Sequence, residues 1–135
     1  MINDSVLVIV DMLHDFIDGS LACANADNAV DNTLQFIQKT RDEDLPLLFI
    51  RDHHPANHSS FREFGGTWPV HCVAGTRGGE IDEKLQPYVD EDLTFDKGCD
   101  PAVEQYSGFD GVNAAGQSLG EVISMLEPEN VFVCG

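Results

Sequence analysis

Acidic and imidazole side chains follow two apolar segments of the chain. Asp11 comes directly after residues 6–10. An acid there either serves a site at the carboxyl edge of a sheet or caps a helix or turn. Asp52 and His54 follow the second segment, residues 45–50, and an extended backbone would point both side chains the same way. One carboxylate, two or three imidazoles and open positions suit Zn²⁺, Fe²⁺ or Mn²⁺.

The five histidines are clustered, because they lie either at His14 or within residues 53–71. This clustering favours a divalent metal site formed by Asp52, His54 and His71. The alternative is a polar loop in which the histidines hydrogen-bond backbone groups.

Lys97 is one of three lysines, and it stands between a short apolar segment and Gly98 rather than on a helix face. Beside a buried acid, its ammonium group could lower the pKa of a thiol or carry a proton. Sequence spacing alone does not separate these roles from that of an ordinary solvated lysine.

Short apolar runs rich in β-branched residues predict strands that are buried on both faces, as in a parallel sheet. Apolar residues that recur every three or four positions predict helices between them. The predicted elements are strands at 6–10, 45–50, 131–134 and, less regularly, 93–95, and helices at 27–41 and 117–126.

Alternation of strands and helices predicts an α/β fold, a mostly parallel sheet with flanking helices in a single domain over residues 1–135. Residues 52–116 are irregular, and a loop region that long usually contains the functional residues. The strand at 131–134 is followed only by Gly135, although ligands of such sheets bind beyond the carboxyl ends of the strands. We therefore expect that the C-terminal part of the fold is missing from this chain.

The strongly acidic composition argues against negatively charged partners. Seven Lys and Arg against 24 Asp and Glu give a formal charge of −17, which disfavours nucleic acids and anionic membranes. The longest strongly apolar run, residues 6–10, is far too short to span a bilayer. We expect a cytoplasmic protein whose four cysteines are free thiols.

Four ordered motifs cover nearly the whole chain. They are V-I-V-D-M-L-H-D-F at residues 8–16, R-D-H-H-P-A-N-H-S-S-F at 51–61, T-W-P-V-H-C-V-A-G-T at 67–76, and K-G followed by Y-S-G-F within 97–109. Together they resemble the nicotinamidase/pyrazinamidase branch of the isochorismatase-like cysteine hydrolases. Two positions depart from that pattern, because His14 stands at a common Asn and His53 replaces an aromatic residue.

The resemblance implies a three-layer, Rossmann-like fold with six strands. It also implies an amidohydrolase of NAD metabolism that converts nicotinamide, and pyrazinamide, to the acid and ammonia through a cysteine thioester. Asp11 matches the general base and Lys97 the lysine of the catalytic triad.

The resemblance further implies a divalent metal, Zn²⁺ above Fe²⁺ or Mn²⁺, that orients the pyridine ring. Asp52, His54 and His71 match its ligands, and His58 matches a ligand found in some members only. The aromatic residues expected to bind the substrate are Phe16, Trp68 and Tyr106.

In this family the nucleophilic cysteine lies several residues beyond the strand that matches 131–134. We therefore assign the nucleophile to none of the four cysteines, and expect residues 1–135 to be inactive alone. Two other hypotheses stay open. The chain could be a metal-binding fragment, or half of an assembly completed by another copy or a C-terminal polypeptide. It could instead be another isochorismatase-like amidohydrolase, although those relatives generally lack the metal ligands Asp52, His54 and His71.

Overall fold

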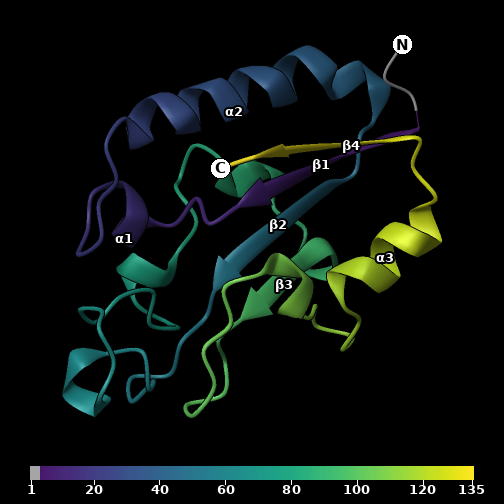
Figure 1. Ribbon diagram of the computed structural model, residues 1–135. Coiled ribbons are helices and arrows are strands. Elements are labelled where there is room, and N and C mark those ends of the chain that lie inside the picture. The colour runs from purple at the N-terminus through teal and green to yellow at the C-terminus, as the bar shows by residue number, and fades with distance from the viewer. Residues whose placement is uncertain (1–3) are drawn as a thin grey trace.

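A parallel four-stranded sheet forms the centre of the protein. The structure is a computed structural model that describes residues 4–135 (Figure 1). The sheet has the order β3-β2-β1-β4. Its strands are β1 (Ser5–Val10), β2 (Leu47–Asp52), β3 (Thr94–Lys97) and β4 (Asn130–Cys134). All three pairings are parallel, so the carboxyl ends of the strands meet at one edge of the sheet.

The helix α2 (Ala26–Thr40) covers one face of this sheet (Figure 1). Leu7 and Ile9 of β1 are buried in one core cluster with Val30 and Ile37 of the helix. The spacing of those two helical residues places them on one face, which explains the sequence periodicity.

The opposite face is covered by α3 (Leu119–Leu126), so the fold has three layers (Figure 1). Val6 and Val8, the alternate residues of β1, pack there with Val122. A capping box between Ser118 and Glu121 fixes where α3 begins.

The predicted elements agree with the structure to within about two residues at most ends, as expected for sequence patterns. The expectation that residues 131–134 form a buried strand was wrong. Val131 and Val133 are 46% and 67% exposed, and among residues 4–135 β4 is an edge strand whose one neighbour is β1. Residues 4–135 contain four of the six strands that the resemblance implies.

The segment between β2 and α3 is irregular, as predicted, and contains only β3 and short 3₁₀ turns. A one-turn helix, α1 (His14–Ile17), follows β1 and was not predicted. These loops surround the carboxyl edge of the sheet, where the chemically reactive side chains lie.

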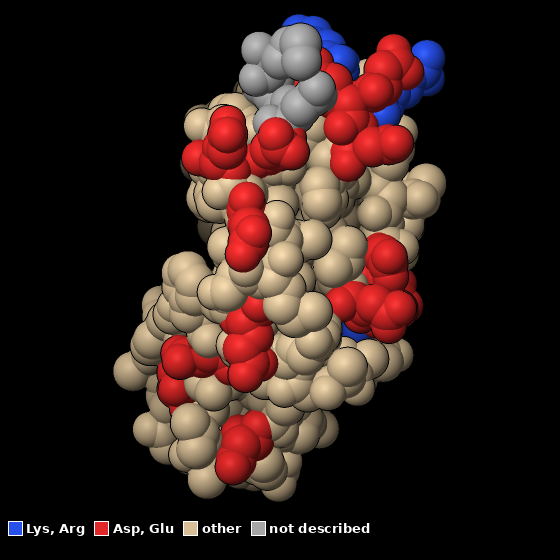
Figure 2. All heavy atoms as spheres, turned by 90° about the vertical axis from the view of Figure 1, so that its right-hand side faces the viewer, with Lys and Arg blue, Asp and Glu red and all other residues tan. Residues whose placement is uncertain are grey.

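Acidic side chains are spread over the face of the molecule shown in Figure 2, with few Lys and Arg among them. Among residues 4–135, no helix is both long and apolar enough to cross a membrane.

Candidate active site

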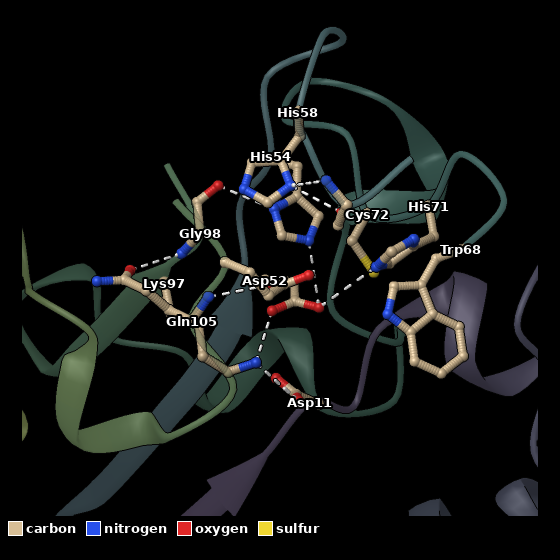
Figure 3. Close-up of polar contacts among 12 residues, drawn as sticks. Asp11, Asp52, His54, His58, Trp68, His71, Cys72, Lys97, Gly98 and Gln105 are labelled. Atoms are coloured by element: carbon tan, nitrogen blue, oxygen red, sulfur yellow. Dashed lines mark hydrogen bonds and ion pairs between the residues drawn. The ribbon is translucent and has the colours of Figure 1, made fainter. Parts of the chain in front are cut away.

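The ends of three neighbouring strands bring Asp11, Asp52 and Lys97 together (Figure 3). Asp52 and Lys97 are register partners at the ends of β2 and β3, and Asp11 directly follows β1. The backbone of Asp11 has φ 54°, a left-handed conformation in which Asp and Asn are enriched. This turn ends the strand and keeps the carboxylate beside the sheet edge.

Lys97 is the centre of this group and is only 3% exposed. Its Nζ donates hydrogen bonds to Asp11 Oδ2 at 3.1 Å and to Asp52 Oδ1 at 2.5 Å. Burial of an ammonium group is costly unless carboxylates compensate it, and here two do. They outweigh the burial, so the pKa of Lys97 lies above its ordinary value and the group stays charged.

The two carboxylates respond differently to the same environment. Burial raises the pKa of Asp11 to about 6, although the positive charge of Lys97 opposes the shift. Burial also acts to raise the pKa of Asp52, but His54 and Lys97 outweigh it and hold that pKa below its ordinary value. Asp11 is therefore the acid of this pair that can exchange a proton near neutral pH.

The second carboxylate oxygen of Asp52 faces two histidines. Asp52 Oδ2 lies 3.5 Å from His54 Nε2 and 3.7 Å from His71 Nε2. The opposite ring nitrogen, Nδ1, is 2.8 Å from the carbonyl oxygen of Gly98 in His54 and of Pro69 in His71. Because a carbonyl only accepts hydrogen bonds, both Nδ1 atoms carry a proton, and in the neutral imidazole the lone pair is then on Nε2.

This donor set fits a divalent metal ion. One atom from each of Asp52, His54 and His71 lies within 4.8 Å of the others, and all three residues are buried. Hydrogen bonds from the second ring nitrogen to backbone carbonyls are the usual way of fixing a metal-binding imidazole. Three protein ligands would leave coordination positions open.

His58 does not join this group. Its Nε2 donates to the carbonyl oxygen of Val103 at 2.8 Å, and its Nδ1 lies 2.7 Å from Ser60 Oγ. Donor atoms of His54, His58 and Glu104 also lie within 4.8 Å of one another. Because both nitrogens of His58 already have partners, its observed role is to stack on His54, with ring centroids 4.1 Å apart.

A cavity of about 280 Å³ opens in front of Asp11, Lys97 and Asp52. Its lining contains the three aromatic residues named from the sequence, Phe16, Trp68 and Tyr106, together with His71, Leu21, Cys23, Glu104 and Gln105. The indole of Trp68 donates to the Tyr106 hydroxyl at 3.4 Å. The cavity is therefore apolar and aromatic on one side and charged on the other.

Two polar lining residues, Glu104 and Gln105, were not identified from the sequence. Gln105 Oε1 accepts a hydrogen bond from the backbone N–H of Gly98 at 2.9 Å and so holds the loop whose carbonyl orients His54. An isolated Glu-Gln pair in an irregular loop gives no sequence signal for this role.

Asp15 was noted only as part of a motif, but it positions the loop that contains His71. Its Oδ2 accepts the backbone N–H of Cys72 at 2.8 Å, and its Oδ1 accepts that of Ser20 at 3.3 Å. Cys72 is buried and has φ 51°, so this bond supports an unfavourable backbone conformation next to a potential metal ligand.

We expect Gly98→Ala to weaken binding of Zn²⁺ by at least about tenfold, a loss typical of disturbed metal-ligand support. Gly98 has φ +67°, and an added Cβ would collide with the His54 ring. Calorimetric titration of each purified variant with Zn²⁺ measures the effect.

Gly116→Ala is the matched control, because Gly116 also has positive φ, +78°, but an added Cβ would meet nothing within 4 Å. Equal affinities in the two variants would show that the position of His54 does not determine metal binding.

Fold and site together define an α/β protein with a buried acid–lysine pair beside three buried side chains that could hold a cation. The chain belongs to the isochorismatase family, because the Isochorismatase domain matches residues 5–135. Among curated proteins, it is 30% identical over 119 residues to a nicotinamidase of Escherichia coli K12. That alignment covers 76% of this chain, which spans 55% of the length of the relative.

Solved structures give the same family relationship. A pyrazinamidase of Pyrococcus horikoshii in complex with zinc is 34% identical, with a TM-score of 0.82 over 98% of this chain and 70% of that one. The protein PnC1 of L. infantum in complex with nicotinate is 32% identical, with a TM-score of 0.78 over 97% of this chain and 66% of that one.

Proposed function

We propose that this chain forms the substrate-binding and acid–base part of a nicotinamidase, which hydrolyses nicotinamide, and pyrazinamide, to the acid and ammonia. The observation that supports this most strongly is the buried Lys97 between Asp11 and Asp52, with the second oxygen of Asp52 facing His54 and His71. The similarity to a nicotinamidase and to a nicotinate complex supports the same substrate class.

The cavity favours a small flat ring. Its volume, about 280 Å³, lies just below the usual range for ligand pockets, about 300–1,000 Å³. Phe16, Trp68 and Tyr106 offer aromatic faces and edges against which a pyridine ring can pack.

Asp52, His54 and His71 would hold the divalent ion through Oδ2 and the two Nε2 atoms. Zn²⁺ is our proposal for its identity, because two imidazoles and one carboxylate are common Zn²⁺ ligands and a zinc complex is among the similar structures. When bound, the ion supplies a Lewis-acidic position that can accept the lone pair of the ring nitrogen.

Asp11 acts as the general base in the proposed reaction. Its carboxylate takes the proton of a cysteine thiol, and the thiolate forms a bond to the carboxamide carbon. Collapse of the tetrahedral intermediate breaks the C–N bond, and the proton held by Asp11 leaves with the nitrogen as ammonia. Water then adds to the thioester, releasing the carboxylic acid and the thiol. Lys97 holds Asp11 in place through its hydrogen bond at 3.1 Å.

We propose that the nucleophile is none of the four cysteines in residues 1–135. Burial raises the pKa of Cys72, Cys99 and Cys134, which is the opposite of what thiolate formation requires. Cys23 lines the cavity, but it is exposed and its Sγ lies 3.5 Å from the carbonyl oxygen of Leu21. We further propose that residues 1–135 alone do not turn over substrate.

We expect the acid limb of kcat/KM to have its midpoint above the ordinary pKa of an aspartate, because burial raises the pKa of Asp11 to about 6. Activity requires the carboxylate, so it falls as the pH drops through 6.

The free energy of unfolding depends on the same proton but changes with pH in the opposite direction. The folded state binds this proton more tightly than the unfolded chain, so the Asp11 contribution to the free energy of unfolding decreases as pH rises from about 4 to 6. A pH–rate profile measures the acid limb of kcat/KM, and a midpoint of that limb near 4 would contradict the assignment of Asp11 as the base.

The test of the function is ammonia release by the full-length gene product and by residues 1–135. Nicotinamide should be hydrolysed by the full-length protein, and benzamide, which has the same flat shape without the ring nitrogen, much more slowly. The Cys23→Ser variant of the full-length protein should hydrolyse nicotinamide as fast as the wild type, because Cys23 is not assigned as the nucleophile. Absence of ammonia release from nicotinamide by the full-length protein would refute the function. Robust release by residues 1–135 that is lost in Cys23→Ser would instead overturn our placement of the nucleophile.

A further inference from the structure

A second group of metal-binding side chains lies outside the site described above. One donor atom from each of His14, Asp82 and Glu83 lies within 4.8 Å of the others. None of the three residues lines the cavity in front of Lys97. His14 also stands where the family resemblance leads us to expect Asn, so the pattern of that family does not account for it.

The backbone holds the two segments of this group in fixed positions. The N–H of His14 donates to the carbonyl oxygen of Glu80 at 3.0 Å, and the N–H of Asp82 donates to that of Met12 at 2.9 Å. These bonds flank an isolated antiparallel bridge between the two segments. His14 and Asp82 therefore lie on the two paired segments of a short antiparallel ladder. The backbone hydrogen bonds hold these two ligands in fixed positions relative to each other.

The imidazole of His14 is buried, with 5% of the residue exposed, yet its hydrogen bonding is incomplete. Its Nε2 lies 2.9 Å from Glu83 Oε2. Its Nδ1 is buried without a hydrogen-bond partner, and the nearest carboxylate oxygen across from it, Asp18 Oδ1, is 3.7 Å away. An unsatisfied buried nitrogen is costly, so its presence requires an explanation.

A cation bound at Nε2 would give this buried ring the role of a metal ligand. Metal binding there needs the Nε2 lone pair, so the ring proton moves to Nδ1, on the side of Asp18. The Asp18 carboxylate accepts two hydrogen bonds from Arg77 and keeps a negative charge on that side of the ring. A metal-binding histidine that donates its other N–H to a carboxylate is a common arrangement.

The two carboxylates are free to act as ligands. Asp82 uses Oδ1 to accept the N–H of Lys84 at 2.9 Å, and within residues 4–135 its Oδ2 has no hydrogen bond. Glu83 has an exposed side chain, 75% accessible, which leaves a route from solvent. The ammonium group of Lys84 pairs with Asp31 at 2.9 Å instead of neutralising the group.

We propose that His14, Asp82 and Glu83 form a second site for a divalent transition-metal ion such as Zn²⁺. One imidazole and two carboxylates form a three-ligand set that Zn²⁺ accepts, and the two negative charges balance the ion. The ion would cross-link the loop at residues 80–83 to the start of α1. That helix begins at His14, three residues after Asp11. This site does not depend on the proposed hydrolase activity.

The test counts Zn²⁺ ions per chain by equilibrium dialysis and elemental analysis of the purified protein. The wild-type protein should bind two ions, and Glu83→Gln and His14→Asn should each lose one. Glu83 is exposed, so its substitution removes a ligand without disturbing the core. The matched control is Glu80→Gln, which changes a neighbouring exposed acid and should still bind two.

A second measurement identifies the histidine directly. Nitrogen-15 NMR of the imidazoles should show the His14 proton moving from Nε2 to Nδ1 when Zn²⁺ is added to the wild-type protein. Affinity at this site should fall at least about tenfold in Glu83→Gln. A His14 ring that does not respond to Zn²⁺, or a Zn²⁺ count that is the same in Glu83→Gln as in wild type, would overturn the proposal.

Discussion

Asp11→Asn should lower the turnover of nicotinamide by the full-length protein by about 10²–10⁴-fold, the usual contribution of a general base. The amide keeps the size of the carboxylate but cannot accept the thiol proton. Asn also tolerates the left-handed backbone conformation at this position, φ 54°, so the fold should be retained. Steady-state ammonia release gives kcat, and KM should change much less because Asp11 is not assigned to ring binding.

Asp110→Asn serves as the control, because Asp110 is an exposed aspartate in a surface turn. It should leave kcat unchanged. If Asp11→Asn retained the turnover of the control, Asp11 would not be the base and the mechanism proposed for this site would be wrong.

Lys97→Met should destabilise the protein by about 3–5 kcal/mol, the range for removing one partner of a buried ion pair. Met fills a similar volume, but Asp11 and Asp52 then lose the ammonium group that both contact. Urea unfolding in the presence of a chelator measures the change without a contribution from bound metal.

Two further variants show whether the loss comes from uncompensated charge. Lys84→Met removes a lysine from an exposed pair with Asp31, so its effect should be small. Adding Asp11→Asn to Lys97→Met should recover part of the lost stability, because one of the unpaired carboxylates is removed. A single Lys97→Met variant as stable as Lys84→Met would contradict the electrostatic account of this site.

Much of the site could be predicted from sequence because parallel strands end at the same edge of a sheet. Once residues 6–10 and 45–50 are read as buried strands, Asp11 and Asp52 must lie near each other. The structure adds Lys97 to them through the register of β2 and β3, which spacing alone did not reveal. The position of His71 depends on a long irregular loop, so the clustering of histidines and the family resemblance indicated its role, and no strand or helix pattern did.

Other features could not be predicted because they depend on contacts between distant loops. His58 shares a motif with His54, but Ser60 and Val103 occupy its ring nitrogens. The bond from Gly98 to Gln105 joins positions in an irregular segment without periodicity. The exposure of β4 also escaped prediction, because an apolar sequence shows the tendency to form a strand and not whether both sides of the strand are covered.

The central claim is that Asp52, His54 and His71 bind one divalent ion beside the Asp11–Lys97 pair. Anomalous diffraction at the zinc absorption edge, from crystals grown with Zn²⁺ and nicotinamide, tests it directly. Our account predicts a strong peak bonded to Asp52 Oδ2, His54 Nε2 and His71 Nε2, with the pyridine ring in the adjoining aromatic cavity. A map with no peak among these three atoms would contradict it.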